Sequence, residues 1–255
     1  MMNEARARSL LCAALDVSSA TEAASLASSL AGKVGTLKVG LELFVAEGQF
    51  GVTQVRAAAP HAKLFLDLKL CDIPETVARA VKSAAQTHAD YLTVHASGGR
   101  EMLKRAVAAA DDASGGKLRI LAVTVLTSLD HADLEGLGWS QEAGDDRVKS
   151  HALRLAELAW AAGVRGFVCS PREAAAFREN LPPEAFLVTP GVRLAESRLS
   201  ESSMAQDDQK RVETPSAAVR AGASLLVVGR PFRDAPDPGA AADAMVRDLV
   251  DAMAT

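Results

Sequence analysis

Short apolar runs alternate along the chain with longer, alanine-rich runs in which apolar positions recur every three to four residues. The short runs predict strands and the long runs predict helices, because side chains repeat with a period of two in a strand and 3.6 in a helix. Eight strands are expected, at Leu10–Val17, Thr36–Gly40, Lys63–Leu70, Tyr91–Ala96, Arg119–Leu126, Gly166–Cys169, Phe186–Val188 and Leu225–Val228. Helices are expected between them, for example at Ser19–Ser29, Glu75–Thr87, Arg100–Ala110, Val148–Ala162 and Gly239–Ala254.

Strand–helix alternation favours a parallel sheet, and eight units favour its closure into a (β/α)8 TIM barrel. The 255 residues are the usual size of one such barrel, so a single α/β domain over 1-255 is expected, with 1-9 as a loose N-terminal segment. An open doubly wound sheet is the alternative, but it usually has a Gly-rich first turn, whereas this one is Asp16–Ser19. The polar stretches Ser128–Asp146 and Leu194–Arg211 follow strands five and seven, so they are candidate lids or, alternatively, surface excursions.

Composition and charge narrow the classes of function. The net charge of -4 argues against a general nucleic-acid binder, which usually carries a basic stripe. No run of about 18 apolar residues predicts a membrane span. Cys12, Cys71 and Cys169 form no CxxC pair, so a reducing, cytoplasmic location is expected, with Cys12 and Cys169 as packing residues. The five histidines are scattered, and no metal site is expected.

The third strand carries two charges on one face. Side chains alternate faces along a strand, so Asp67 and Lys69 share a face above Phe65, and leucines occupy the other face. In a barrel the charged face points inward, and a charged pair at the carboxyl end of a strand is costly to bury without a purpose. We interpret the pair as catalytic; a structural ion pair is the alternative.

Neighbouring strands repeat this pattern. The same alternation places Asp16 on strand one, Lys38 on strand two and His95 on strand four on the inner face. Alternating carboxylates and ammonium groups can fix one carboxylate while keeping a neighbouring lysine protonated. For His95, a hydrogen-bonded core histidine and a contact to a ligand are equally good interpretations.

The last two strands end in glycine and arginine. Gly191 and Arg193 follow strand seven, and Gly229 and Arg230 follow strand eight. Glycine lets the backbone approach a ligand, arginine binds phosphate in a planar fork, and barrels commonly bind phosphate at these two loops. Two surface arginines are the alternative. Asp72 stays open at this point, because its position also suits a cap of the following helix.

With these residues in place, the chain resembles the orotidine 5′-phosphate decarboxylase family from Ala14 to Pro231. The resemblance is carried by LKVG at 37–40, FLDLKLCDIPET at 65–76, VHASGG at 94–99, AVTVLTS at 122–128, VTPGVR at 188–193, DQKR at 208–211 and GRP at 229–231. The D-x-K-x-x-D element is shared by related barrels, whereas the DQKR loop together with the LTS turn is more specific.

The resemblance implies decarboxylation of orotidine 5′-phosphate to UMP, the last step of UMP synthesis, by a homodimer with shared active sites and no cofactor. Lys69 is the implied proton donor to C6 of the pyrimidine, and Asp67 and Lys38 complete the charged array. Asp72 is implied to join that array from the neighbouring subunit, and Thr76 to reach the ribose from there. The implied substrate contacts are Asp16, Lys38, Asp67, Ile73, Thr76, Thr127, Ser128, Arg193, Gln209, Gly229 and Arg230.

Within that set, the 5′-phosphate contacts are implied for Gln209, Gly229 and Arg230, with Arg193 beside them and the 194–211 loop closing over. Two positions depart from the family pattern: Cys71 stands where His or another residue is usual, and Glu75 where Asn is usual. Retained activity is expected, with local differences at the helix start and dimer contact.

Two other functions compete with this one. A Mg²⁺-dependent decarboxylase or aldolase of the same superfamily, acting on a sugar phosphate, shares Asp67, Lys69 and Asp72 but does not need the LTS turn or Gln209. A non-catalytic phosphate-binding barrel is the other; for such a protein, Lys69→Ala would leave nucleotide affinity and every activity unchanged.

Overall fold

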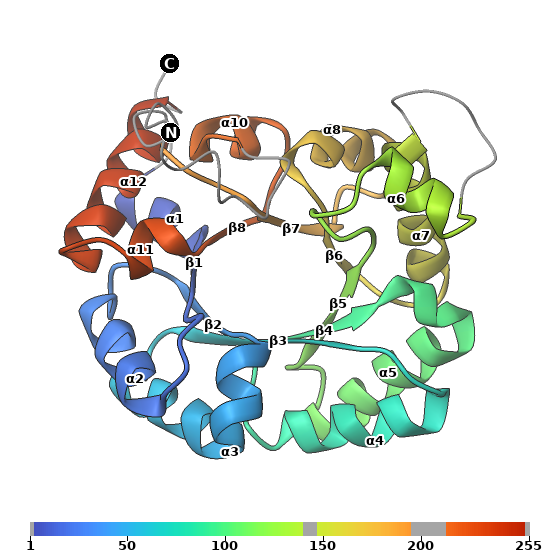
Figure 1. The fold of residues 1–255 in the computed structure, drawn as a ribbon, viewed down its shortest axis with the longest axis horizontal. Helices are drawn as coiled ribbons and strands as arrows, with labels where there is room; N and C mark the ends of the chain where they lie inside the picture. The colour runs from blue at the N-terminus through green and yellow to red at the C-terminus, as the bar shows by residue number, and fades with distance from the viewer. Residues whose placement is uncertain (1–2, 140–146, 195–212, 253–255) are drawn as a thin grey trace.

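The computed structural model describes residues 3–139, 147–194 and 213–252. Eight parallel strands form one closed barrel in the order β1-β2-β3-β4-β5-β6-β7-β8, and β8 pairs with β1. The helices lie outside this ring of strands (Figure 1). The predicted (β/α)8 fold is therefore confirmed.

All eight strands lie where the apolar runs predicted them, although β1 and β5 end three residues earlier than expected. Their bounds are β1 Leu11–Ala14, β2 Thr36–Val39, β3 Lys63–Leu70, β4 Tyr91–His95, β5 Arg119–Val123, β6 Gly166–Val168, β7 Phe186–Pro190 and β8 Leu225–Val228. The backbone N–H of Leu15 still donates to the Lys38 carbonyl, and that of Thr124 to the Val168 carbonyl, so each segment follows its neighbouring strand for one more residue.

The helices described are α1 Glu4–Ser9, α2 Ala20–Ser29, α3 Leu41–Ala58, α4 Pro74–Ala85, α5 Gly99–Ser114, α6 His131–Gly136, α7 Arg147–Ala161, α8 Pro171–Asn180, α10 Pro215–Arg220, α11 Arg230–Arg233 and α12 Pro238–Ala252, with a 3₁₀ turn η1 at Ala96–Gly98. The polar stretch after strand five is thus partly helical. Its helix α6 begins at a capping box in which Asp130 accepts hydrogen bonds from the backbone of Ala132 and Asp133.

The interpretation of residues 1–9 as a loose segment is wrong for α1. Asn3 caps this helix by accepting a hydrogen bond from the backbone N–H of Arg6, and Ala7 is fully buried. Arg8 pairs with Asp243 of α12 at 3.3 Å. The helix is too short to show an apolar period, so its stability comes from these tertiary contacts.

Apolar side chains form two separate cores. Residues such as Leu11, Ala13 and Leu37 pack outward against the helices, while an inner cluster fills the barrel below its mouth. That inner cluster contains Cys12, Ala14, Phe65, Tyr91, Leu121, Val188, Leu225 and Val227. The interior of the barrel is therefore a packed core below the carboxyl ends of the strands. None of the helices in the described ranges is both long and apolar enough to cross a membrane.

Candidate active site

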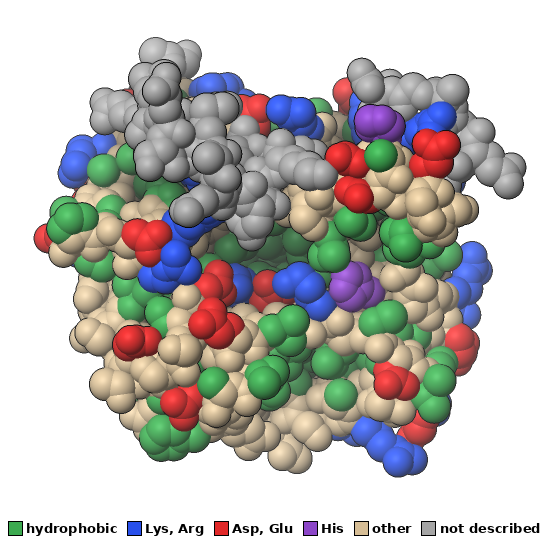
Figure 2. Space-filling model, in the orientation of Figure 1, with side chains coloured by type: hydrophobic (Ala, Val, Ile, Leu, Met, Phe, Trp, Pro, Cys, Tyr) green, Lys and Arg blue, Asp and Glu red, His purple; other side chains and the backbone are tan. Residues whose placement is uncertain are grey.

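A cavity of about 540 Å³ opens at the carboxyl ends of the strands. Figure 2 shows this face of the molecule, where acidic and basic side chains adjoin along the lower edge of a central hollow with an apolar interior. Eight of the predicted site residues line the cavity: Asp16, Lys38, Asp67, Lys69, Thr127, Arg193, Gly229 and Arg230. The structure thus brings together residues from the ends of six strands, β1, β2, β3, β5, β7 and β8.

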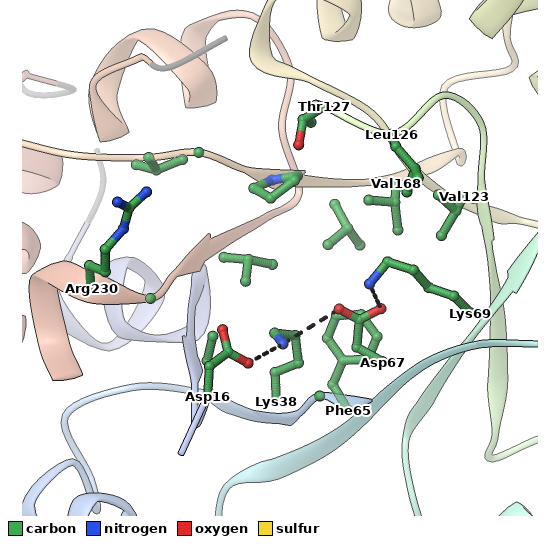
Figure 3. Close-up of a pocket in the computed structure, with 18 of the residues that line it drawn as sticks. Asp16, Lys38, Phe65, Asp67, Lys69, Val123, Leu126, Thr127, Val168 and Arg230 are labelled. Carbon is green, nitrogen blue, oxygen red and sulfur yellow. Dashed lines mark hydrogen bonds and ion pairs between the residues drawn. The ribbon is translucent and has the colours of Figure 1, made fainter. Parts of the chain in front are cut away.

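One side of the cavity, which we call the charged wall, consists of Asp16, Lys38, Asp67 and Lys69. Lys38 Nζ lies 2.9 Å from Asp16 Oδ1 and 3.4 Å from Asp67 Oδ2. Asp67 Oδ1 in turn accepts a hydrogen bond from Lys69 Nζ at 2.9 Å. Figure 3 shows these four side chains as a continuous chain of alternating charge. Strand alternation correctly placed all four on the inner face.

Burial and charge act in opposite directions on the two central members of the wall. Burial favours the neutral form of Lys38, but Asp67 and Asp16 outweigh it and hold the pKa of the ammonium above its usual range. Burial likewise raises the pKa of the Asp67 carboxyl, but Lys38 and Lys69 outweigh it, so that this pKa lies below its usual range. Both groups are therefore charged at neutral pH.

Two residues that support the wall were not singled out from the sequence. Thr93, on the inner face of β4, donates a hydrogen bond from its hydroxyl to Asp67 Oδ1 at 2.9 Å. Gly40 leaves room for the first ion pair, because a Cβ there would meet Asp16 Oδ1 at 2.8 Å and Lys38 Nζ at 3.0 Å. Strand alternation could have identified Thr93, because it lies two residues before His95 and therefore on the same inner face. Gly40 was named only as the last residue of the second expected strand and of the LKVG block, and neither assigned it to the wall.

The opposite side of the cavity is lined mainly by hydrocarbon. This apolar wall consists of Val123, Val125, Leu126, Val168, Val188 and Val227. Thr127 lies at its edge, and Figure 3 shows it across the cavity from the charged wall. Ser128, the next residue, is exposed and does not line the cavity. A flat ring bound here has charge on one side and hydrocarbon on the other.

Arginines gather at one end of the cavity. Arg230 begins α11 and lies at the far end of the cavity from Lys69 in Figure 3. Arg193 lines the same cavity after β7, and its backbone N–H bonds to the carbonyl of Glu213. Arg233 also lines the cavity, although nothing in the sequence distinguished it. Its Nε donates to Asp234 at 2.6 Å, and its Nη1 donates to the carbonyl of Asp16 at 3.4 Å.

Three predicted residues on the loop after β3 and the start of α4 do not reach this cavity. Asp72, Ile73 and Thr76 are exposed, and 67% of the Ile73 surface is accessible. Asp72 Oδ1 accepts a hydrogen bond from the adjacent Ile73 N–H at 2.6 Å. The N-cap residue of α4 is Ile73, and this cap has no side-chain hydrogen bond. The alternative interpretation of Asp72 as the helix cap is therefore wrong. Gln209 and all of the 194–211 loop except Leu194 lie outside the described residues.

The two residues that depart from the family pattern, Cys71 and Glu75, lie outside the cavity. Cys71 is an exposed free thiol. Glu75 pairs with Arg79 at 2.9 Å and with Arg105 at 2.6 Å, which links α4 to α5.

His95 is partly buried and does not line the cavity. Burial, followed by the charge of Lys69, lowers the pKa of its imidazole. Within the described ranges, no group of three or more His, Cys, Asp or Glu is arranged to hold a metal ion.

Comparisons with known proteins agree with the motif blocks. A model of the orotidine 5′-phosphate decarboxylase / HUMPS family matches residues 9–245. A protein named orotidine 5′-phosphate decarboxylase from Anaeromyxobacter sp. (strain K) is 52% identical over 240 residues, covering 94% of this chain and 97% of the relative. Its namesake from Thermobifida fusca (strain YX) is 49% identical over 239 residues, covering 94% and 95%.

The solved structures include a similar barrel. The orotidine 5′-phosphate decarboxylase from Lactobacillus acidophilus superimposes with a TM-score of 0.78 at 32% identity, covering 95% of this chain and 99% of that one. The family resemblance inferred from the sequence is therefore confirmed.

Proposed function

Because the chain belongs to the orotidine 5′-phosphate decarboxylase / HUMPS family, we propose that it decarboxylates orotidine 5′-phosphate to UMP. The observation that carries this proposal is the charged wall, which ends in a partly exposed Lys69 ammonium held by Asp67 at 2.9 Å. The reaction needs a positive charge and a proton at the carbon that loses CO₂. Lys69 supplies both at the surface of the cavity.

The chemistry explains why a lysine is needed there. When the bond between C6 and the carboxylate breaks, its electron pair remains on C6 in an orbital that the ring does not delocalise. The Lys69 ammonium stabilises this carbanion and then transfers a proton to C6, which leaves a neutral amine that solvent reprotonates. These steps balance, because the electron pair left on C6 forms the new C–H bond and solvent restores the lysine proton.

The charge of Lys69 accounts for only part of the lowering of the activation free energy that this reaction requires. Two unit charges 4 Å apart interact by about 4 kcal/mol at an effective dielectric constant of about 20. Enzymatic rate enhancements correspond to about 8–23 kcal/mol, and this reaction belongs near the upper end. Binding energy from the distant phosphate must therefore supply part of the difference by fixing the pyrimidine against the charged wall.

The substrate fits the cavity in one direction. Arg230, with Arg193 and the backbone at Gly229, holds the 5′-phosphate at the end farthest from Lys69, and Gln209 completes that subsite. Asp16 and Lys38 contact the ribose hydroxyls between the two ends. Thr127 flanks the ribose and pyrimidine, and the apolar wall covers the ring. The cavity of about 540 Å³ has the size of a nucleotide-sized ligand site.

We further propose a homodimer in which each subunit completes the other's site. Asp72, Ile73 and Thr76 are exposed and do not line their own cavity, as expected if they serve the partner's. The exposed Val45, one turn after Leu41 on α3, adds apolar surface near the same rim, with 80% of it accessible. Burying such side chains between subunits is favourable because it removes apolar surface from water.

The experiment that tests the function is a spectrophotometric assay on the purified chain. Orotidine 5′-phosphate absorbance should fall on mixing, at a rate that EDTA does not change. No change in absorbance would contradict the proposal. An unchanged absorbance together with turnover of a sugar phosphate that EDTA abolishes would instead favour the Mg²⁺-dependent alternative, because that enzyme would use a metal to stabilise the developing charge.

A further inference from the structure

We propose that Thr93 is a positioning residue for Lys69, and that its hydroxyl holds both the backbone and the ion-pair partner of that lysine. The inference rests on the proposed function, since it assigns Thr93 a part in the same reaction. Thr93 is fully buried on β4, so it does not touch the substrate itself. It acts through two neighbours on β3.

The first argument concerns the direction of the hydrogen bonds. The backbone N–H of Lys69 donates to Thr93 Oγ1 at 2.9 Å, and the same hydroxyl lies 2.9 Å from Asp67 Oδ1. An N–H only donates and an ionised carboxylate only accepts. A hydroxyl has one proton and two lone pairs, so it accepts from Lys69 and donates to Asp67. A hydrocarbon side chain reproduces neither bond, and an amide side chain divides the acceptor and the donor between two atoms.

The second argument concerns the shape of β3. Leu66 pairs with Leu92 and Leu70 pairs with Val94, so three residues of β3 stand opposite Thr93 alone. Such a bulge interrupts the ladder and leaves backbone N–H groups without a backbone acceptor. Lys69, inside the bulge, has φ 49°, a left-handed conformation that residues with a Cβ rarely adopt. The Thr93 hydroxyl replaces the missing acceptor for this residue.

The two hydrogen bonds meet at the reactive group. Asp67 Oδ1 receives both the Thr93 hydroxyl and Lys69 Nζ, while Asp67 Oδ2 faces Lys38. One hydroxyl thus fixes where the Lys69 main chain lies and where its carboxylate partner points. Without it, the bulge can relax and the ammonium loses its fixed direction into the cavity. Positional errors of about 1 Å are enough to reduce turnover strongly.

The matched test compares Thr93→Val, which replaces the hydroxyl with a methyl group of similar size, with Thr93→Ser, which keeps the hydroxyl. We expect Thr93→Val to lower kcat about 10- to 100-fold and to change KM less than about threefold, because the substrate contacts remain. Thr93→Ser should retain kcat within about threefold. Thr189→Val is the control: that threonine is also fully buried, and its hydroxyl has no hydrogen-bond partner among the described residues.

A second measurement does not depend on turnover. In the free protein, the Lys69 amide hydrogen should exchange about 10- to 100-fold faster in Thr93→Val than in wild type or Thr93→Ser. If wild type fails to decarboxylate orotidine 5′-phosphate, the proposed function fails, and this exchange rate still tests the hold on Lys69. If Thr93→Val does not fold, Thr93→Ala against Thr93→Ser gives the same comparison.

Three results would overturn the inference. These are an unchanged kcat in Thr93→Val, an unchanged Lys69 exchange rate, or a loss in Thr93→Ser as large as that in Thr93→Val. The last result would mean that packing of the γ-methyl group, and not the hydroxyl, is what the site requires.

Discussion

The charged wall and the apolar wall face each other across one cavity, but different forces hold them. The charged wall is a chain of contacts between 2.9 and 3.4 Å, in which each ion is fixed by its neighbour. The apolar wall is held by packing, and its valines come from β5 to β8. The first three strands thus supply the ions, and the last four supply a hydrocarbon surface and the arginines at the rim.

This difference assigns separate tasks to the two walls. Preorganised charge lowers the energy of a transition state because it need not reorient during the reaction. Hydrocarbon opposite that charge excludes water and keeps the local dielectric constant low, which strengthens every ionic interaction in the cavity. In this account, the charged wall performs the chemistry, and the apolar wall with the arginines holds the nucleotide against it.

The largest effect is expected from removing the reactive ion. Lys69→Ala should lower kcat at least about 10⁴-fold with the fold intact, because it removes both the proton donor and the positive charge. Lys63→Ala is the control, since Lys63 begins the same strand at the opposite end of the barrel. Steady-state kinetics and circular dichroism measure both variants. If the chain were a non-catalytic phosphate-binding barrel, Lys69→Ala and Lys63→Ala would not differ in activity.

Restoring activity by subunit mixing tests whether the charged wall is completed by the partner. Lys69→Ala and Asp72→Ala should each be inactive alone, but an exchanged equal mixture should regain up to about a quarter of wild-type activity. Half of its dimers are hybrids, and each hybrid contains one intact site. Native mass spectrometry verifies the exchange. Exchange without recovery would contradict the shared site.

A smaller effect is expected at the phosphate end. Arg230→Ala should lower kcat/KM about 10- to 100-fold, because it removes a charge-assisted contact to the phosphate. Arg233→Ala should cost less than about threefold, because Asp234 and the Asp16 carbonyl already occupy that guanidinium. Steady-state kinetics compares the two variants. Equal losses of kcat/KM in the two variants would contradict a specific contact of Arg230, because the phosphate would then respond to the summed positive charge of the arginines.

The apolar wall should tolerate a modest change. Val168→Thr keeps the side-chain shape but places a hydroxyl against the bound ring, and it should lower kcat/KM about 2- to 10-fold. Val168→Ala serves as the control for lost packing without added polarity. A loss as large as that from Lys69→Ala would contradict the division of tasks between the walls.

The smallest effect is a pH dependence of stability. The pKa of Asp67 is lowered in the folded state, so its charge stabilises the protein above the ordinary carboxyl pKa of about 3.9, and this stabilisation is lost as pH falls through the folded-state pKa. The difference in urea midpoint between wild type and Asp67→Asn should therefore stay constant down to about pH 4 and shrink below it. A difference that already shrinks between pH 6 and 5 would contradict the lowered pKa.

Side-chain alternation was enough to predict the strands and the charged wall, because both depend on which face of a strand is buried. It did not predict the bulge at Lys69, which depends on the register between β3 and β4. Arg233 and α1 were missed because their places are set by contacts distant in sequence. Asp72 stayed undecided because its position in the sequence fitted both a helix cap and the charged array, and a contact between subunits, as proposed for it, has no period along the chain.

The division between the walls is tested most directly by measuring UMP affinity in Lys69→Ala. Isothermal titration calorimetry of this variant and of wild type gives the dissociation constant, and kcat is measured on the same preparations. The account predicts that kcat falls at least about 10⁴-fold while the UMP dissociation constant changes less than about tenfold. A dissociation constant that weakens in proportion to the loss of kcat would contradict it, because Lys69 would then act mainly in binding.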